Sequence, residues 1–241
     1  MSGYRFGPRI DAAGVTYRLW APAAKTVALC TPGADAVPLQ RGQGGWFESV
    51  PLDHTAGTRY RFRIDGGPEV PDPASRRQAE SVHGYSVLTP AASAEADDVR
   101  WRGIDWNRSV IYELHLGTFT PEGTLRSAAE RLPHLAETGV TVVELMPVAD
   151  FAGRRNWGYD GVLPFAPARP YGSPADLRTF IHAAHRLGLG VLLDVVYNHF
   201  GPDGNYLGLY APEFFTTAYE TPWGGAVNFA HPEVRAFFVE N

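Results

Sequence analysis

Three side chains that can carry charge or hydrogen-bond lie in or just after one apolar stretch of the sequence. Residues 191–196 are apolar except for Asp194, and Asn198 and His199 follow before a Gly-Pro-Asp-Gly turn. Such unbroken apolar runs are typical of strands buried on both faces, and parallel α/β folds place their chemistry at the carboxyl ends of these strands. We therefore predict a functional site at Asn198 and His199. The alternative is that these groups only cap the strand or bond a loop.

The elements that would position these groups alternate between strand and helix after residue 109. Strands are predicted at residues 110–116, 140–146 and 190–196. Helices are predicted between them at residues 124–138 and 173–188. The second helix has a strong start signal, because Ser173 can cap it and Pro174 suits its first position. This alternation predicts a parallel sheet with right-handed crossovers.

The first predicted strand separates polar and apolar side chains onto its two faces. Tyr112, Leu114 and Leu116 share one face, and Glu113 and His115 share the other. In a barrel the outer face meets apolar helices, so Glu113 and His115 are expected to point inward or toward the mouth. A buried, hydrogen-bonded structural pair is the favoured interpretation of these two residues, with direct catalysis as the alternative.

The first 90 residues show a different pattern, with short alternating runs separated by glycine and proline. Residues 59–64 alternate strictly between arginine and apolar side chains, and the basic face is interpreted as a solvated sheet surface. Several short strands at this spacing predict an immunoglobulin-like β-sandwich. We expect the sandwich at residues 1–90, a linker at 91–108 and the barrel part at 109–241, with the two domains meeting near residues 101–106.

Composition restricts the class of partner. The chain has 241 residues, 44% of them hydrophobic, and a net charge of −5, which argues against electrostatic binding to nucleic acid or to an anionic membrane. Cys30 is the single cysteine, so no internal disulfide is expected, and a reducing compartment fits. No leader or membrane span is recognised, so a cytoplasmic location is expected. No metal and no cofactor is predicted, and the oligomeric state stays open.

The motifs resemble a known enzyme family. Residues 194–199, Asp-Val-Val-Tyr-Asn-His, resemble the first conserved region of the α-amylase superfamily of glycoside hydrolases, at the end of the third strand of its barrel. The first domain is similar to the amino-terminal module of the glycogen-branching and debranching relatives. Finer similarity to the maltooligosyltrehalose trehalohydrolases is found in residues 112–124, 144–148, 153–161, 198–207 and 221–224. The block Arg-Arg-Asn-Trp-Gly-Tyr-Asp-Gly at 154–161 distinguishes trehalohydrolases from branching enzymes.

The resemblance implies roles for particular residues. Tyr159 would stack on the sugar at the cleavage subsite, and His199 would hydrogen-bond the hydroxyls of that sugar. Trp157 and Trp223 are weaker candidates for stacking, and each could instead be a packed loop aromatic. The residues implied to be structural near the site are Asp160, Asp194 and Asn198.

The implied activity is hydrolysis of the α-1,4 bond next to the terminal trehalose of a maltooligosyltrehalose, with release of trehalose. The implied partner is therefore an α-glucan oligosaccharide with a terminal trehalose. Two alternatives remain open: a fragment of a glycogen branching or debranching enzyme, and a non-catalytic glucan-binding fragment. Product analysis of the longer gene product would separate the trehalose-releasing hydrolysis from branching or debranching.

The resemblance also implies that part of the machinery lies outside this chain. A (β/α)8 barrel needs eight strands, and only the first three β/α units are expected after residue 109. Glycoside hydrolysis needs two carboxylates across the bond. The acids near the expected strand ends are Asp160, Asp194 and Asp203, and none matches a catalytic acid of the family. We therefore expect no catalytic residue in this chain and no activity from it alone; whether its end at Asn241 is natural stays open.

Overall fold

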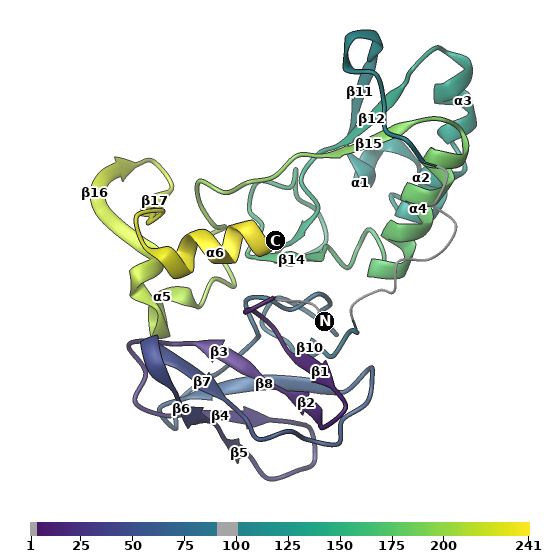
Figure 1. Ribbon diagram of the computed structural model, residues 1–241. Coiled ribbons are helices and arrows are strands. Elements are labelled where there is room, and N and C mark those ends of the chain that lie inside the picture. Colours follow the sequence, from purple (N-terminus) through teal and green to yellow (C-terminus); the bar gives the residue numbers. More distant parts are fainter. Residues whose placement is uncertain (1–3, 91–100) are drawn as a thin grey trace.

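The computed structural model describes residues 4–90 and 101–241. An antiparallel β domain at one end is joined to a mixed α/β part at the other, with the last helix between them (Figure 1). Residues 91–100 of the predicted linker lie outside the described residues.

The β domain consists of short antiparallel strands in three sheets. One sheet has the order β10-β8-β4-β5, with β9 also paired to β8; a second has the order β3-β7-β6; a third pairs β1 with β2. The bounds are β1 (Arg9–Asp11), β2 (Gly14–Thr16), β3 (Arg18–Trp20), β4 (Val27–Cys30), β5 (Val37–Pro38), β6 (Gln40–Arg41), β7 (Trp46–Glu48), β8 (Arg59–Ile64), β9 (Glu69–Val70) and β10 (Ser86–Val87).

Strand β8 shows why this sequence forms a sheet with one buried face. Its alternate residues Tyr60, Phe62 and Ile64 are buried, which matches the predicted alternation. The basic face, however, is not simply solvated. Each arginine on it has a partner: Arg59 pairs with Glu80, Arg61 lies over the ring of Tyr85, and Arg63 pairs with Glu69.

The α/β part contains the predicted parallel sheet. Strand β12 (Val142–Leu145) lies between β11 (Ile111–Leu114) and β15 (Gly190–Leu193), and both neighbours run parallel to it. The register aligns the strand ends, because Leu145 faces Leu114 on one side and Leu193 on the other. The remaining elements are α1 (Leu116–Phe119), β13 (Ala149–Asp150), β14 (Leu163–Pro167), α5 (Leu207–Tyr210), β16 (Phe215–Thr221), β17 (Gly224–Val227), α6 (Pro232–Glu240) and the 3-10 helices η1 (Gln43–Gly45), η3 (Trp106–Arg108) and η4 (Pro212–Phe214).

One of the two predicted helices is continuous and the other is broken. Helix α4 (Pro174–Arg186) begins as predicted, with Ser173 as its N-cap in a capping box with Asp176. The helix expected at 124–138 is instead two short helices, α2 (Leu125–Ala129) and α3 (Leu132–Glu137). The break has a physical cause: Pro133 lies in the first turn of α3, where its missing N–H is harmless, and it would disrupt a continuous helix.

The third strand is less buried than its apolar sequence predicts. Helices α2, α3 and α4 pack against the sheet through a core that includes Val143, Leu145 and Val191. Leu193 and Val195, in contrast, are 46% and 45% exposed, and β15 ends at Leu193. The expectation of a strand at 190–196 buried on both faces was therefore wrong, because the described residues cover only one side of this segment.

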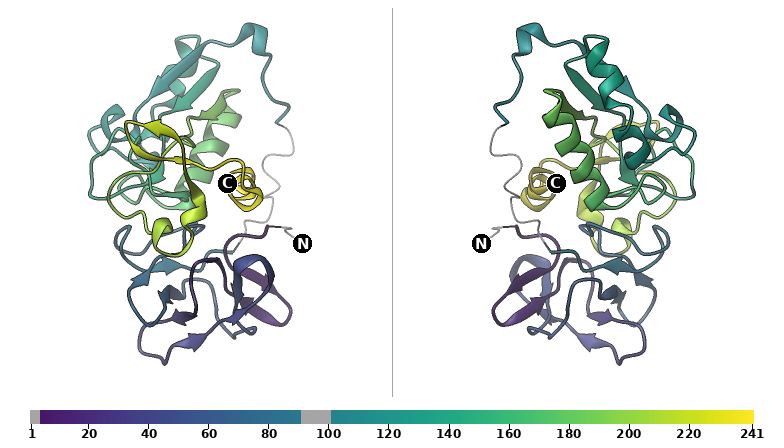
Figure 2. Two further views of the ribbon diagram at one scale, coloured as in Figure 1. Left: turned by 90° about the vertical axis from the view of Figure 1, so that its left-hand side faces the viewer. Right: turned by 90° about the vertical axis from the view of Figure 1, so that its right-hand side faces the viewer.

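One of the hydrophobic cores is shared by the two domains. Phe237 of helix α6 is fully buried against Phe6 of the β domain, with ring centroids 5.1 Å apart, and against Phe214 at the same distance. Figure 2 shows α6 between the β domain and the sheet of the α/β part. The predicted contact near residues 101–106 was wrong, because Trp101 stacks on His185 of α4 and Trp106 is exposed.

A second contact joins the β domain to the loops after the parallel strands. Val82 is buried against Val162 and Leu163 of the α/β part. The ring of His83 lies 2.7 Å from the hydroxyl of Tyr206 and 3.2 Å from Asp203. The segment around Val82 therefore packs against the loops near residues 162 and 204.

The buried carboxyl of Asp72 makes the stability of the β domain depend on pH. It accepts hydrogen bonds from the Tyr60 hydroxyl at 2.7 Å and from the Ala74 N–H at 2.8 Å, and burial raises its pKa to about 6. An acid with a raised pKa in the folded state stabilises fully below its ordinary pKa of 3.8, and this contribution is lost as the pH rises through about 6.

We expect Asp72→Asn to remove this dependence, because the amide stays neutral and keeps an oxygen for the Ala74 N–H. Between pH 4 and pH 7 the wild-type chain should lose roughly 2–2.5 kcal/mol relative to the variant. Urea unfolding at several pH values measures this difference. Identical pH profiles for the two proteins would show that Asp72 does not titrate in this range.

Candidate functional site

The predicted polar cluster forms a cavity at the carboxyl end of the third strand. Its volume is about 400 Å³. Tyr159 and His199 both line it, so the prediction that they share one pocket at this end of the sheet is confirmed. The lining residues are Tyr159, Asp160, Asp194, Val195, Val196, Asn198, His199 and Trp223.

Gly201 brings the two loops of the cavity into contact, and Gly158 brings the first loop against the segment after β12. Tyr159 lies in the loop between β13 and β14, and His199 lies in the segment after β15. The Gly201 N–H donates to the carbonyl of Gly161 at 3.1 Å, and a Cβ at Gly201 would lie 2.2 Å from the carbonyl oxygen of Asp160. Gly158 has a φ of +106° and passes equally close to Pro147. The glycines allow a backbone approach that side chains would prevent.

His199 is held from two directions. Its Nε2 lies 2.9 Å from the backbone carbonyl of Tyr159, and because a carbonyl only accepts, this nitrogen carries the proton. The ring of Trp223 stacks on the imidazole at a centroid distance of 5.0 Å and an angle of 13°. The Nδ1 atom is buried and has no hydrogen-bond partner within the described ranges. A neutral His199 therefore keeps one acceptor that no described protein group uses, and this acceptor is buried.

The hydroxyl of Tyr159 is fixed by a neighbouring acid. It donates to Asp194 Oδ2 at 3.2 Å. Desolvation, followed by the negative charge of Asp194, raises the pKa of Tyr159. The side chain is nevertheless 39% exposed, so part of the ring is open to the cavity. Asp194 thus positions the tyrosine.

The loop that carries Tyr159 is organised by Asn156, to which sequence reasoning assigned no role of its own. Its side-chain oxygen accepts from the N–H groups of Gly158 and Asp160, and its Nδ2 donates to Asp160 Oδ2 at 2.8 Å. An asparagine that bonds the backbone two residues later is typical of a turn, so its place before Trp157-Gly158 was the available signal. Asp160 is therefore bonded by its own loop.

The polar pair predicted on the first strand is separated in the structure. His115 Nε2 lies 2.7 Å from the carbonyl of Asn156, and the Tyr171 hydroxyl lies 3.1 Å from the same nitrogen. Glu113 is exposed and forms no pair with His115 in the described part of the chain. His115 therefore has the structural role that was favoured, but the pairing with Glu113 was wrong, because His115 lies in the turn that follows the strand.

The two tryptophan candidates differ in position. Trp223 lines the cavity from the turn between β16 and β17. Trp157 is 77% exposed and does not line it. Of the seven residues proposed for the site from sequence, six therefore meet at one cavity.

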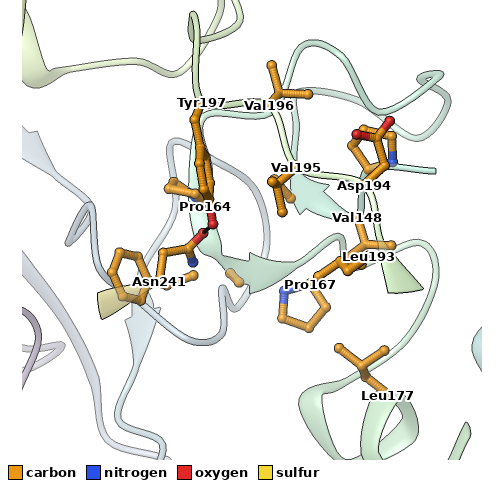
Figure 3. A pocket seen from close by; sticks show the side chains of 14 residues that line it. Val148, Pro164, Pro167, Leu177, Leu193, Asp194, Val195, Val196, Tyr197 and Asn241 are labelled. Carbon is orange, nitrogen blue, oxygen red and sulfur yellow. Dashed lines mark hydrogen bonds between the residues drawn. The ribbon is translucent and has the colours of Figure 1, made fainter. Parts of the chain in front are cut away.

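A smaller and more apolar cavity adjoins the first. It has a volume of about 220 Å³, and Asp194, Val195 and Val196 line both cavities. Figure 3 shows Tyr197 reaching from the strand end to Asn241, and its hydroxyl donates to Asn241 Oδ1 at 2.9 Å. The side chains that close this cavity are mainly proline and aliphatic, so it offers packing space and little chemistry.

The chemistry of the larger cavity suits binding of a polyhydroxylated ligand. It combines two aromatic rings, a histidine acceptor, an amide and two acids. Both acids already accept hydrogen bonds from protein groups, Asp194 from Tyr159 and Asp160 from Asn156. No cluster of three or more metal-ligating side chains occurs among the residues described.

Comparison with known proteins identifies the family. The model for the alpha amylase catalytic domain matches residues 83–209, more than half of the chain. The chain belongs to the α-amylase family. Residues 5–75 of this family member also match carbohydrate-binding module 48, the isoamylase N-terminal domain.

Relatives with known names cover almost the whole chain. Over 97% of this chain, it is 47% identical to a malto-oligosyltrehalose trehalohydrolase of Deinococcus radiodurans. Over 98% of this chain, it is 45% identical to one of Saccharolobus solfataricus. A 1,4-alpha-glucan branching enzyme of Streptomyces coelicolor is 35% identical over 95% of the chain and 34% of its own length. The chain spans only about two fifths of the two trehalohydrolases, 38% and 42% respectively.

Solved structures show the same architecture. A crystal structure from Salmonella typhimurium, described as an alpha amylase, superposes with a TM-score of 0.94 and 47% identity over 98% of this family member and 41% of its own chain. Over the described ranges, no helix is long and apolar enough to cross a membrane.

The close approach at Gly201 predicts the effect of a single methyl group. Gly201→Ala would place its Cβ against the Asp160 backbone, so the two loops must separate. We expect a loss of roughly 1–3 kcal/mol of stability and a shift of the His199 ring resonances as its bond to Tyr159 lengthens.

The control is Gly208→Ala in helix α5, where an added Cβ meets no atom within 4 Å. It should leave the His199 signals unchanged. Urea unfolding and NMR spectra of the histidine ring nitrogens measure both effects. Equal histidine spectra for Gly201→Ala and wild type would contradict the contact.

Proposed function

We propose that this chain forms the amino-terminal part of a malto-oligosyltrehalose trehalohydrolase and supplies one side of its sugar site. The observation that carries this proposal is the 47% identity to a named trehalohydrolase over 97% of the chain. The block at residues 154–161 supports it, because this segment positions Tyr159 at the wall of the cavity.

In this proposal each cavity residue has a defined task. The exposed ring of Tyr159 stacks on the sugar at the cleaved bond, with its hydroxyl held by Asp194. His199 accepts a hydrogen bond from a hydroxyl of that sugar through Nδ1, because Nε2 donates to the Tyr159 carbonyl; Nδ1 is buried in the free chain and must be uncovered for this contact. Trp223 adds a second aromatic surface above His199. Trp157 is a weaker contributor because it lies outside the cavity.

The reaction adds water across the α-1,4 bond next to the trehalose unit, giving free trehalose and a shortened malto-oligosaccharide. It needs one carboxyl as acid and a second carboxylate as nucleophile or base. Asp160 and Asp194 are both engaged in loop hydrogen bonds. We therefore assign the catalytic acids to the part of the relatives that this chain does not span, so the chain alone is expected to be inactive.

The domain assignment follows the same proposal. Residues 1–90 form the immunoglobulin-like carbohydrate-binding domain, residues 91–108 the linker, and residues 109–241 the first three β/α units of a (β/α)8 barrel. The antiparallel sheets and the order β11-β12-β15 support this division. The shared core around Phe237 adds that the two domains are packed as one body.

Product analysis tests the activity. A protein that continues this chain through the full length of the trehalohydrolases should convert maltotriosyltrehalose and water into equal amounts of maltotriose and trehalose. The 241-residue chain at the same concentration should release no trehalose. Release of trehalose by the purified short chain would show that the catalytic groups are misassigned.

A second candidate is favoured by the 35% identity to a branching enzyme. A branching enzyme would transfer a glucan segment and create new α-1,6 bonds, which the same products analysed by NMR would reveal. New α-1,6 signals without trehalose would favour this alternative. Glucan binding without any product from the longer protein would favour a non-catalytic binding role.

A further inference from the structure

A third cavity, an open cleft, lies on the β domain and is lined by arginines. It has a volume of about 390 Å³ and lies over the sheet of β3, β7 and β6. The side chains that matter for its chemistry are Arg5, Arg18, Arg41, Gln40, Gln43 and Glu48. Three carry positive charge and one carries negative charge, in a protein with a net charge of −5.

The strand register fixes the centre of this cleft. Glu48 of β7 lies opposite Arg18 of β3 on one side and opposite Gln40 of β6 on the other. Arg18 is nine-tenths buried, and its guanidinium lies 5.4 Å from the centre of the Trp46 ring. Its Nε is 3.1 Å from Glu48 Oε1, but the geometry is not that of a hydrogen bond. Its Nη1 donates to the carbonyl of Tyr4 at 3.4 Å, so the Arg18 side chain is held in place and its positive charge lies beside the cleft.

Arg41 supplies a charge that carboxylates do not neutralise. Its Nη1 donates to the carbonyl of Ala24 at 2.8 Å, and its Nη2 donates to the carbonyl of Pro22 at 3.1 Å. No carboxylate pairs with it within residues 4–90 and 101–241. Because carbonyls orient the guanidinium without cancelling its charge, Arg41 contributes a fixed positive potential.

The remaining charges leave the cleft positive. Arg5 pairs loosely with Glu240, with Nε 3.5 Å from Oε1. Burial lowers the pKa of Arg18, and the positive charges of Arg9 and Arg5 lower it further, against Glu48 and Glu240. An anion bound in this cleft would reduce the repulsion between Arg18 and the neighbouring arginines. It would also give Arg41 a counter-charge.

We propose that this cleft binds a phosphoryl group, carried either by inorganic phosphate or by a phosphorylated sugar. Guanidinium groups match the oxygen geometry of phosphate, and the amides of Gln40 and Gln43 can donate to further oxygens. The proposal is independent of the function assigned to the other cavity, because it concerns a separate surface of the β domain.

Calorimetric titration of the chain with sodium phosphate at constant ionic strength tests the proposal. We expect saturable binding of one phosphate per chain. Arg18→Gln should weaken it about tenfold by removing a charge-assisted donor. Gln43→Glu, at an exposed position, should weaken it to a similar degree by adding negative charge.

Two further variants make the test specific. Glu48→Gln should tighten phosphate binding roughly threefold, because it removes the one acid that lines the cleft. Arg131→Gln, an exposed arginine of the α/β part, removes the same charge elsewhere and should change nothing. Glucose 6-phosphate binding more tightly than phosphate, while glucose does not bind, would identify a sugar phosphate; equal affinities would identify free phosphate. Absence of binding, or equal weakening by Arg131→Gln, would overturn the proposal.

Discussion

Phe237→Ala should cost the chain about 3–5 kcal/mol of unfolding free energy, because it empties the centre of the core that both domains share. The ring is fully buried and meets Phe6 of the β domain, Phe165 of β14 and Phe214 of η4, all at centroid distances near 5 Å. Few neighbours can collapse into the space, since rings from three different segments frame it.

Val239→Ala on the same helix is the matched control, because Val239 is largely exposed and should cost less than about 0.5 kcal/mol. Urea unfolding followed by circular dichroism measures both free energies. If Phe237→Ala costs no more than Val239→Ala, helix α6 does not carry the contact between the domains.

Arg169→Gln should destabilise by a similar amount, about 3–5 kcal/mol, because it leaves the carboxylate of Asp150 buried without its countercharge. Asp150 is fully buried, and Arg169 Nε lies 3.1 Å from its Oδ2. Arg169 also donates to the backbone carbonyl of Glu80, so it ties the segment after β14 to the β domain.

The pH dependence of this variant has a definite sign. Burial raises the pKa of Asp150, and the charge of Arg169 opposes that rise. Without Arg169 the pKa of Asp150 rises further. The loss of unfolding free energy in Arg169→Gln is therefore largest at neutral pH, and it shrinks as falling pH protonates Asp150.

Arg126→Gln removes the same group from an exposed pair with Asp176 and should cost about 0–1 kcal/mol. Unfolding free energies at pH 5 and pH 8 provide the comparison. A small, pH-independent loss in Arg169→Gln would contradict the buried pair.

The parts of the fold that could be predicted from sequence depend on local signals. Ser173 and Pro174 mark a helix start through their own chemistry, and the apolar run after Gly190 marks a strand. Tyr159 and His199 could be placed at one site because parallel strands end on the same side of a sheet, and because the motifs resemble a family.

The parts that could not be predicted depend on contacts distant in sequence. Nothing local to Phe237 indicates that its partner is Phe6, and the change of pattern between residues 64 and 110 did not reveal where the two domains meet. The exposure of Leu193 likewise depends on which elements cover the sheet. The sequence around Leu193 does not indicate this. Pro133 was a local signal for the break between helices α2 and α3, but the helical spacing of the leucines favoured one continuous helix.

We expect this chain to provide one side of a glucan site built on Tyr159. The most direct measurement is calorimetric titration of the chain with maltotriosyltrehalose, for wild type, Tyr159→Ala and Tyr219→Ala. Tyr219 is an exposed tyrosine on β16 that does not line the cavity, so it serves as the matched control.

We predict weak, saturable binding by the wild type, unchanged in Tyr219→Ala and reduced about tenfold or more in Tyr159→Ala. Equal binding by Tyr159→Ala and wild type, or no binding by any of the three proteins, would contradict the account.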